Sequence, residues 1–156
     1  MSRAFVLLLV LYSGCAGAQP DGAQPAMGAT DLIGQYVAID SVQVYTGTDW
    51  EPRAVENTMD LTARGDTLRL RLDLVQTNAH MCWADLDLTQ AADTLWQAAT
   101  DWGCSLQLAV EPTSLQVLDP DNTCRRRLCG ARAVLDGATF PRPPAGPPAP
   151  DEPRLP

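Results

Sequence analysis

The segment "LRLRLDL", residues 68–74, decides the fold class. Leucine occupies every second position, with arginine or aspartate between. A period of two places successive side chains on opposite faces of a β-strand, whereas a helix would scatter these leucines around its axis. The segment therefore predicts a strand with one buried face and one solvated face.

The residues just before this segment alternate in the same way. Met59, Leu61 and Ala63 are separated by polar residues, and Arg64-Gly65-Asp66 then forms a turn sequence. Two alternating runs joined by a short glycine-containing turn are typical of a β-hairpin. We expect the two runs to pair as antiparallel strands.

Further short strands are predicted along the rest of the chain. Alternation, or a short apolar run between turn residues, marks four of them: 82–88, 94–99, 104–110 and 114–118; a last strand is predicted over 131–135. No stretch has the periodicity of a long helix. About eight short strands with regularly spaced turns predict an all-β domain, a small antiparallel barrel or sandwich with sequential hairpins.

The first strand region contains a change of phase. Val37 and Ile39 share one phase of the alternation, whereas Val42 and Val44 share the other. A slip of one residue inside a strand is what a β-bulge or corner produces. The sequence therefore predicts a bulge or a corner at residues 40–41.

Both ends of the chain have the composition of segments outside the domain. Arg3 followed by the apolar run 4–12 predicts a secretory signal over residues 1–18. The apolar run itself is too short to span a bilayer. Two cleavage sites remain open. One lies before Cys15, which would then carry a lipid anchor, and the other follows Ala18. Residues 19–30 predict a flexible tether, residues 31–140 one β domain, and residues 141–156 a disordered proline-rich tail.

The predicted domain contains four cysteines, and either cleavage leaves this even number. In an exported chain an even number of cysteines predicts disulfides, and the long spacing between the first two does not match a zinc knuckle. No metal or cofactor is predicted. A meander brings all four sulfurs to one end of the sheet. We favour Cys82–Cys104 with Cys124–Cys129, and the crossed pairings remain open.

The segment "CRRRLCG", residues 124–130, concentrates positive charge in a tight loop. Guanidinium groups bind carboxylates well, and aromatic side chains beside arginine are common binding anchors. The candidate binding residues, with Trp83 expected nearby, are Arg125, Arg126, Arg127 and Arg132. The alternative is that these arginines only keep a tight turn soluble.

The overall charge excludes one class of partner. The formal net charge is −8, and every basic residue is arginine. An acidic chain repels the phosphates of nucleic acids, so no nucleic-acid partner is expected. An acidic surface favours solubility or the binding of a basic partner.

The sequence contains few candidate catalytic residues. His80 is the single histidine, and it lies beside a cysteine expected to be oxidised, so it has no free thiolate to activate. Asp85 and Asp87 share the solvent face of a strand, which indicates either a hydrated face or an acid–base pair. Phosphate loops, nucleophile elbows and metalloprotease helices are missing from the sequence. We expect a protein without enzymatic activity; the alternative is an enzyme whose site has no recognisable motif.

The C-terminal half resembles small exported bacterial domains of uncharacterised function. The resemblance is carried by "AHMC" at residues 79–82, Cys124, "CGAR" at 129–132, "DG" at 136–137 and Phe140. It implies a disulfide-bonded β domain. Some such domains occur next to lysozyme-inhibitor-like modules, so a lysozyme-inhibitor-like protein is a further alternative.

Together these features predict an exported, non-catalytic protein of the periplasm or cell envelope, lipid-anchored if cleavage precedes Cys15, and otherwise secreted. Its partner is expected to be a protein or an anionic envelope polymer. Contact with the membrane is expected only through the lipid anchor.

Overall fold

The computed structural model describes residues 27–143 as an all-β domain, which confirms the predicted fold class. Each strand pairs antiparallel with the next, in the order β1 to β8, so the predicted meander is also confirmed. The strands are β1 (Gly34–Tyr45), β2 (Trp50–Arg64), β3 (Thr67–Gln76), β4 (His80–Ala92), β5 (Leu95–Ala99), β6 (Ser105–Val110), β7 (Ser114–Leu118) and β8 (Thr139–Pro141). The helical elements are the 3₁₀ turns η1 (Ala29–Leu32), η2 (Thr77–Ala79) and η3 (Pro120–Asn122), and the single α turn α1 (Arg125–Leu128).

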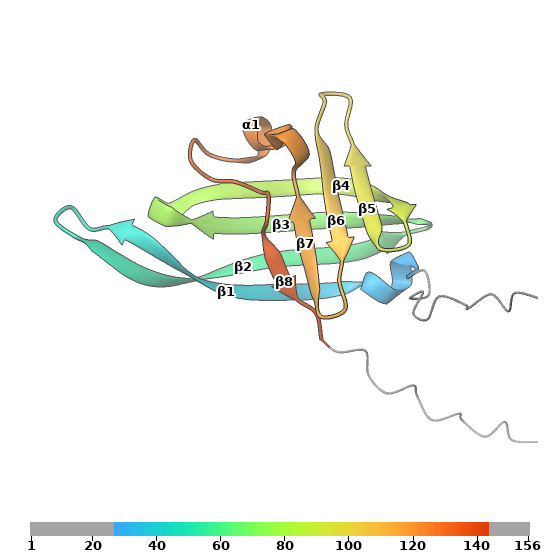
Figure 1. Ribbon diagram of the computed structural model, residues 1–156, viewed down its shortest axis with the longest axis horizontal. Helices are drawn as coiled ribbons and strands as arrows, with labels where there is room; N and C mark the ends of the chain where they lie inside the picture. The colour runs from blue at the N-terminus through green and yellow to red at the C-terminus, as the bar shows by residue number, and fades with distance from the viewer. Residues whose placement is uncertain (1–26, 144–156) are drawn as a thin grey trace, which may run out of the picture.

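The strands form two layers that nearly close into a barrel. The long strands β1–β4 lie behind the shorter strands β5–β8, which cross them steeply (Figure 1). Strand β4 belongs to both layers, because its first part pairs with β3 and its end pairs with β5. Within residues 27–143 no ladder joins β1 to β8, so the barrel has one seam.

Strand β3 supplies the centre of the core, as the alternation of residues 68–74 predicted. Its four leucines are fully buried. In the predicted hairpin, Leu70 lies opposite Leu61 and Leu72 opposite Met59, so the two strands bury the same face. Trp96 and Phe140 from the front layer are the largest side chains that complete this core.

Of the bulge or corner predicted at residues 40–41, the bulge is wrong. Strand β1 pairs with β2 without interruption, and the register puts Tyr36 opposite the buried Met59. The phase of β1 is therefore set by its partner, and Val37 and Ile39 point outward; Ile39 is 66% exposed. The irregular register lies instead between Gln90 and Ala92, where β4 passes from one layer to the other.

The predicted last strand over residues 131–135 is also wrong. Ala133 and Leu135 are buried as the alternation indicated, but this stretch is a loop, and the last strand is β8. The Gln76 amide accepts a hydrogen bond from the Val134 N–H (2.9 Å) and donates one to the Val134 carbonyl (2.7 Å). A side chain thus satisfies the backbone polar groups that a neighbouring strand would otherwise satisfy.

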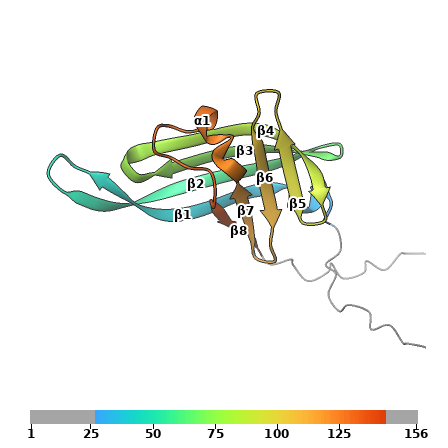
Figure 2. The ribbon, with the colours of Figure 1, turned by 45° about the horizontal axis from the view of Figure 1, so that its top comes forward.

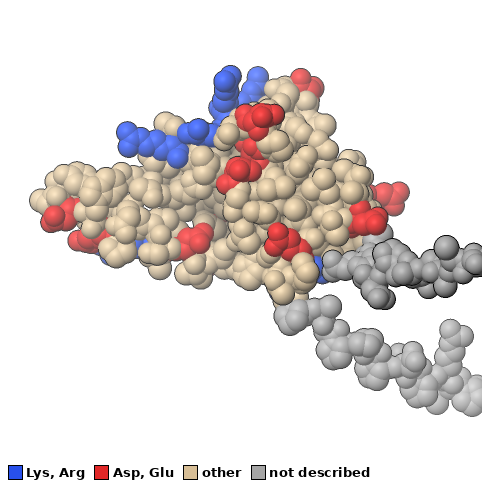
Figure 3. Space-filling view, in the orientation of Figure 1, with Lys and Arg blue, Asp and Glu red and all other residues tan. Residues whose placement is uncertain are grey.

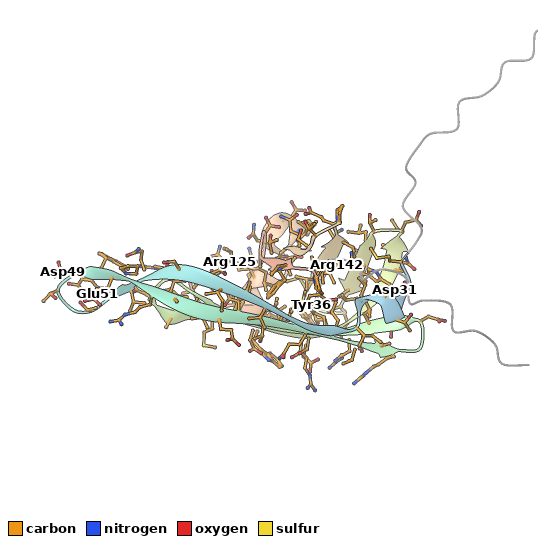
Figure 4. The ribbon with its side chains drawn as sticks, turned by 90° about the horizontal axis from the view of Figure 1, so that it is seen from below. Asp31, Tyr36, Asp49, Glu51, Arg125 and Arg142 are labelled. Atoms are coloured by element: carbon orange, nitrogen blue, oxygen red, sulfur yellow. A yellow bond between two sulfur atoms is a disulfide. The ribbon has the colours of Figure 1, made fainter. Side chains whose placement is uncertain are left out.

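The β1–β2 hairpin continues beyond the barrel as an arm, residues 42–53, which carries Asp49 and Glu51 at its tip (Figures 1 and 4). The ladder between β2 and β3 ends at Thr58, and the buried Asn57 fills the point of divergence. Its amide donates to an Asp40 carboxylate oxygen and accepts from the Val75 N–H, both at 2.6 Å.

Candidate functional site

The four cysteines of the domain meet at one end of the barrel, as predicted, but the favoured pairing is wrong. The disulfides are Cys82–Cys129 and Cys104–Cys124. Each one joins the segment around α1 to a different strand, because Cys82 lies in β4 and Cys104 directly precedes β6. The arginine-rich turn is therefore attached to both layers of the barrel.

The conformation of residues 124–130 explains this pairing. Arg125–Leu128 form one α-helical turn, closed by a hydrogen bond from the Cys129 N–H to the Arg125 carbonyl (3.0 Å). The chain then becomes extended, and Cys129 forms a β-bridge with Cys82. The Gly130 N–H donates to the Met81 carbonyl at 2.8 Å. Figure 2 shows α1 above the strands at this end of the barrel.

The buried carboxylate of Asp119 holds the start of this turn. It accepts hydrogen bonds from the backbone N–H groups of Cys124 (2.9 Å) and Arg125 (3.0 Å), and from the Thr123 hydroxyl (3.4 Å). These N–H groups have no partner within a helix, so a carboxylate placed before them stabilises the turn.

Arg125 is part of the loop structure. Its guanidinium donates to the Ala133 carbonyl (2.9 Å) and to the Ala131 carbonyl (3.2 Å). The side chain therefore closes the loop that follows α1, and it is less exposed than Arg126 and Arg127. The expectation that all three consecutive arginines face a partner does not fit Arg125.

Arg126 and Arg127 are exposed, and Trp102 accompanies them. The Arg127 guanidinium lies 5.3 Å from the centre of the Trp102 ring, a cation–π contact. We call Arg126, Arg127 and Trp102 the α1 face. Trp83, expected beside the arginines, lies instead on the outer wall of β4 opposite Asp73. Trp102 could have been found from its position two residues before Cys104, had the Cys104–Cys124 disulfide been known.

Two open hollows flank Arg126. One, of about 390 Å³, lies against Arg125, Cys129 and Gly130, and the other, of about 440 Å³, lies against Trp102 and Arg127. Asp121 lines both hollows. The α1 face is thus uneven, with room on both sides of an exposed guanidinium.

The arginines of strands β2 and β3 differ from those of the α1 face in their partners. Among residues 27–143, ion pairs within 4.0 Å involve Arg53–Glu51, Arg64–Asp87, Arg69–Asp85, Arg69–Asp87 and Arg71–Asp85. None of the described ion pairs includes Arg126, Arg127 or Arg132. Figure 3 shows arginine side chains gathered along one edge of the molecule, with carboxylates beside them and scattered over the rest of this view.

Arg132 belongs to a separate cleft, which it lines together with Trp50 of the arm and His80 at the start of β4. The four predicted binding arginines therefore divide into three environments. Arg125 binds the loop, Arg126 and Arg127 form the α1 face, and Arg132 faces the arm.

The two carboxylates considered as an acid–base pair, Asp85 and Asp87, both form ion pairs with arginine. Both lie on β4 and pair with Arg69 of the neighbouring strand β3. Hydrogen bonding to Asp85, with a smaller effect of Asp87, raises the pKa of the Arg69 guanidinium above its ordinary value. The two carboxylates therefore act as partners of a permanently charged group. In the described part of the chain, His, Cys, Asp and Glu side chains form no group able to hold a metal ion.

No family model, curated protein or solved structure matches this chain. Across residues 27–143 we find no helix with the length and apolar character needed to cross a membrane.

Proposed function

We propose that the protein is an exported, non-catalytic binding module of the cell envelope, and that its α1 face binds an acidic protein or an anionic envelope polymer. The observation that carries the proposal is that Arg126 and Arg127 present charges on a rigid turn, unpaired among the described residues. Both are exposed, neither forms an ion pair with a described residue, and both sit on a turn attached by two disulfides. A rigid turn loses little conformational entropy on binding, so its guanidinium groups are well suited to bind carboxylates or phosphates.

The two disulfides support the proposed location. Disulfides persist in oxidising compartments such as the periplasm and the cell exterior, and are rare in the cytosol. The apolar segment at residues 4–12 supports export, although it lies outside the described residues.

Replacing both Arg126 and Arg127 with Ser is expected to weaken binding to immobilised envelope extract about tenfold or more, because two charge-assisted contacts are lost. The free energy of unfolding should change by less than about 0.5 kcal/mol, since both side chains are exposed. Surface plasmon resonance and urea denaturation measure the two quantities. Raising the salt concentration to about 0.5 M should weaken the wild type similarly, because it screens exposed charges.

The matched control is the double variant Arg53→Ser, Arg64→Ser, which removes the same charge from strand β2. Both of these arginines pair with acids, so binding should stay near the wild-type value. Equal weakening by the two double variants would show that only net charge matters and would reject the α1 face as a binding surface.

We further propose that Cys15, outside the described residues, is acylated and that the tether links the domain to the membrane. Cells expressing the full chain with a fatty-acid analogue should produce labelled protein, and Cys15→Ala should abolish the label. An unlabelled mature protein that begins at Gln19 would instead establish ordinary signal cleavage.

A further inference from the structure

A cleft of about 150 Å³ opens where three segments meet near the tip of the arm. Trp50 comes from the arm, Gln76 to His80 from the turn between β3 and β4, and Arg132 from the loop after α1. Its lining residues are Trp50, Gln76, Thr77, Asn78, His80 and Arg132. We call it the Trp50 cleft.

Hydrogen bonds fix the three segments relative to one another. The Tyr45 N–H donates to the Asn78 carboxamide oxygen at 2.7 Å, which ties the arm to the β3–β4 turn. The two bonds between Gln76 and Val134 tie the same turn to the loop that carries Arg132. The Trp50 ring also packs against Tyr45, whose ring centre lies 5.5 Å away at a tilt of 48°. The cleft is therefore pre-formed.

The turn between β3 and β4, which contributes Thr77 and Asn78 to the cleft, adopts a strained backbone. Asn78 and Ala79 have φ of 57° and 56°, in the left-handed region. Asparagine tolerates this region, but alanine is disfavoured there by about 1–2 kcal/mol. Strained residues concentrate at binding sites, where the surrounding structure imposes them.

The polar groups of the cleft are largely free to bind a ligand. Among the described residues, no hydrogen bond or ion pair engages the Arg132 guanidinium, the His80 imidazole, the Thr77 hydroxyl or the Asn78 amide nitrogen. Trp50 is 55% exposed. The cleft thus combines a cation, an aromatic ring and several groups that donate or accept hydrogen bonds, and no carboxylate is among the described residues that line it.

We propose that the Trp50 cleft binds one acidic sugar residue, a pyranose ring that carries a carboxylate. The indole face of Trp50 packs against the C–H face of the ring, and the Arg132 guanidinium binds the carboxylate in a bidentate manner. Thr77, Asn78 and His80 bind the ring hydroxyls. The volume is below the roughly 300 Å³ of a drug-sized ligand pocket, so it admits a single ring of a longer chain.

The composition of the cleft favours a sugar over an acidic peptide. A peptide ligand would need apolar pockets for its side chains, but within residues 27–143 Trp50 is the only large apolar residue that lines the cleft. A saccharide presents hydroxyls all around its ring, which matches the surrounding polar groups. The proposal does not depend on the α1 face, because the two regions share no lining residue.

Calorimetry of the full mature protein with tetragalacturonic acid tests the proposal. Wild-type protein should bind it, and Trp50→Ala and Arg132→Ser should each weaken binding about tenfold or more, as expected for aromatic and arginine anchors. Fully methyl-esterified tetragalacturonate should bind about tenfold more weakly, because its carboxylates are blocked. Far-ultraviolet circular dichroism and thermal melting should show that both variants fold.

Two matched controls distinguish binding in the Trp50 cleft from binding by any exposed tryptophan or arginine. Trp83→Ala removes an equally exposed tryptophan from β4. The double variant Arg126→Ser, Arg127→Ser removes both arginines of the α1 face. Both control variants should bind within about twofold of wild type. Absence of wild-type binding, equal binding of the ester, or tighter binding of a hexaglutamate peptide would each overturn the proposal. Loss of binding only in the α1-face variant would also overturn it, while supporting the function proposed for that face.

Discussion

Replacing Cys82 and Cys129 together with Ser is expected to lower the free energy of unfolding by about 4 kcal/mol. The disulfide joins residues 47 positions apart, so it removes much of the conformational freedom of the unfolded chain. The Cys104–Cys124 disulfide spans 20 positions, and its removal by the same double substitution should cost about 3 kcal/mol. Both values are a large part of the stability of a typical domain, about 5–15 kcal/mol.

Urea denaturation of the oxidised wild type and the two double variants measures these differences. Non-reducing peptide mapping checks the pairing directly, and it should recover peptides joining Cys82 to Cys129 and Cys104 to Cys124. A peptide that joins Cys124 to Cys129 would contradict the attachment of α1 to two strands. A greater loss from the shorter disulfide would contradict an entropic origin of the two magnitudes.

Replacing Asp119 with Ala is expected to cost about 3 kcal/mol or more. The carboxylate is buried, and its loss leaves the Cys124 and Arg125 N–H groups without their acceptor at the start of α1. Hydrogen bonds to charged groups contribute about 1.5–3 kcal/mol each, and a buried donor left without a partner is costly. Since Arg126 and Arg127 follow directly, the α1 face should lose its fixed geometry as well.

The matched control is Asp121→Asn, which removes an exposed carboxylate two residues away and should change stability by less than about 0.5 kcal/mol. Asparagine is chosen because Asp121 has a φ of 61°, a conformation that asparagine tolerates. Asp119→Asn, which keeps one acceptor oxygen, should fall between this control and Asp119→Ala. Thermal and urea unfolding measure stability, and amide hydrogen exchange at residues 124–129 reports on the turn itself. Unchanged protection of these amides in Asp119→Ala would show that the disulfides alone hold α1.

The sequence predicted the fold class because β-strand periodicity is a local property. Alternation in residues 68–74 depends only on which side chains avoid water, and the same leucines are buried in the structure. The order of the strands followed from the short turns, because two strands joined by a short turn pair with each other as a hairpin. The meeting of four sulfurs at one end then followed from the meander.

The same reasoning failed where a residue's neighbour lies far away in the sequence. Val37 and Ile39 are apolar residues of the kind usually buried, but the register with β2 turns them outward. Residues 131–135 alternate like a strand, but Gln76 occupies the position of the missing partner. In both cases a partner outside the local window decided the outcome.

By itself, the sequence determined an all-β domain with four cysteines at one end and an arginine-rich turn between two of them. Only the tertiary structure decided the pairing of those cysteines, because it depends on how α1 lies across the barrel end and not on loop length. It also separated Arg125, the α1 face and Arg132 into three environments, and it brought Trp50 beside Arg132, 82 positions away. Local patterns specify which face of an element is buried, but a binding surface is made by contacts between elements, and those contacts exist only in the folded chain.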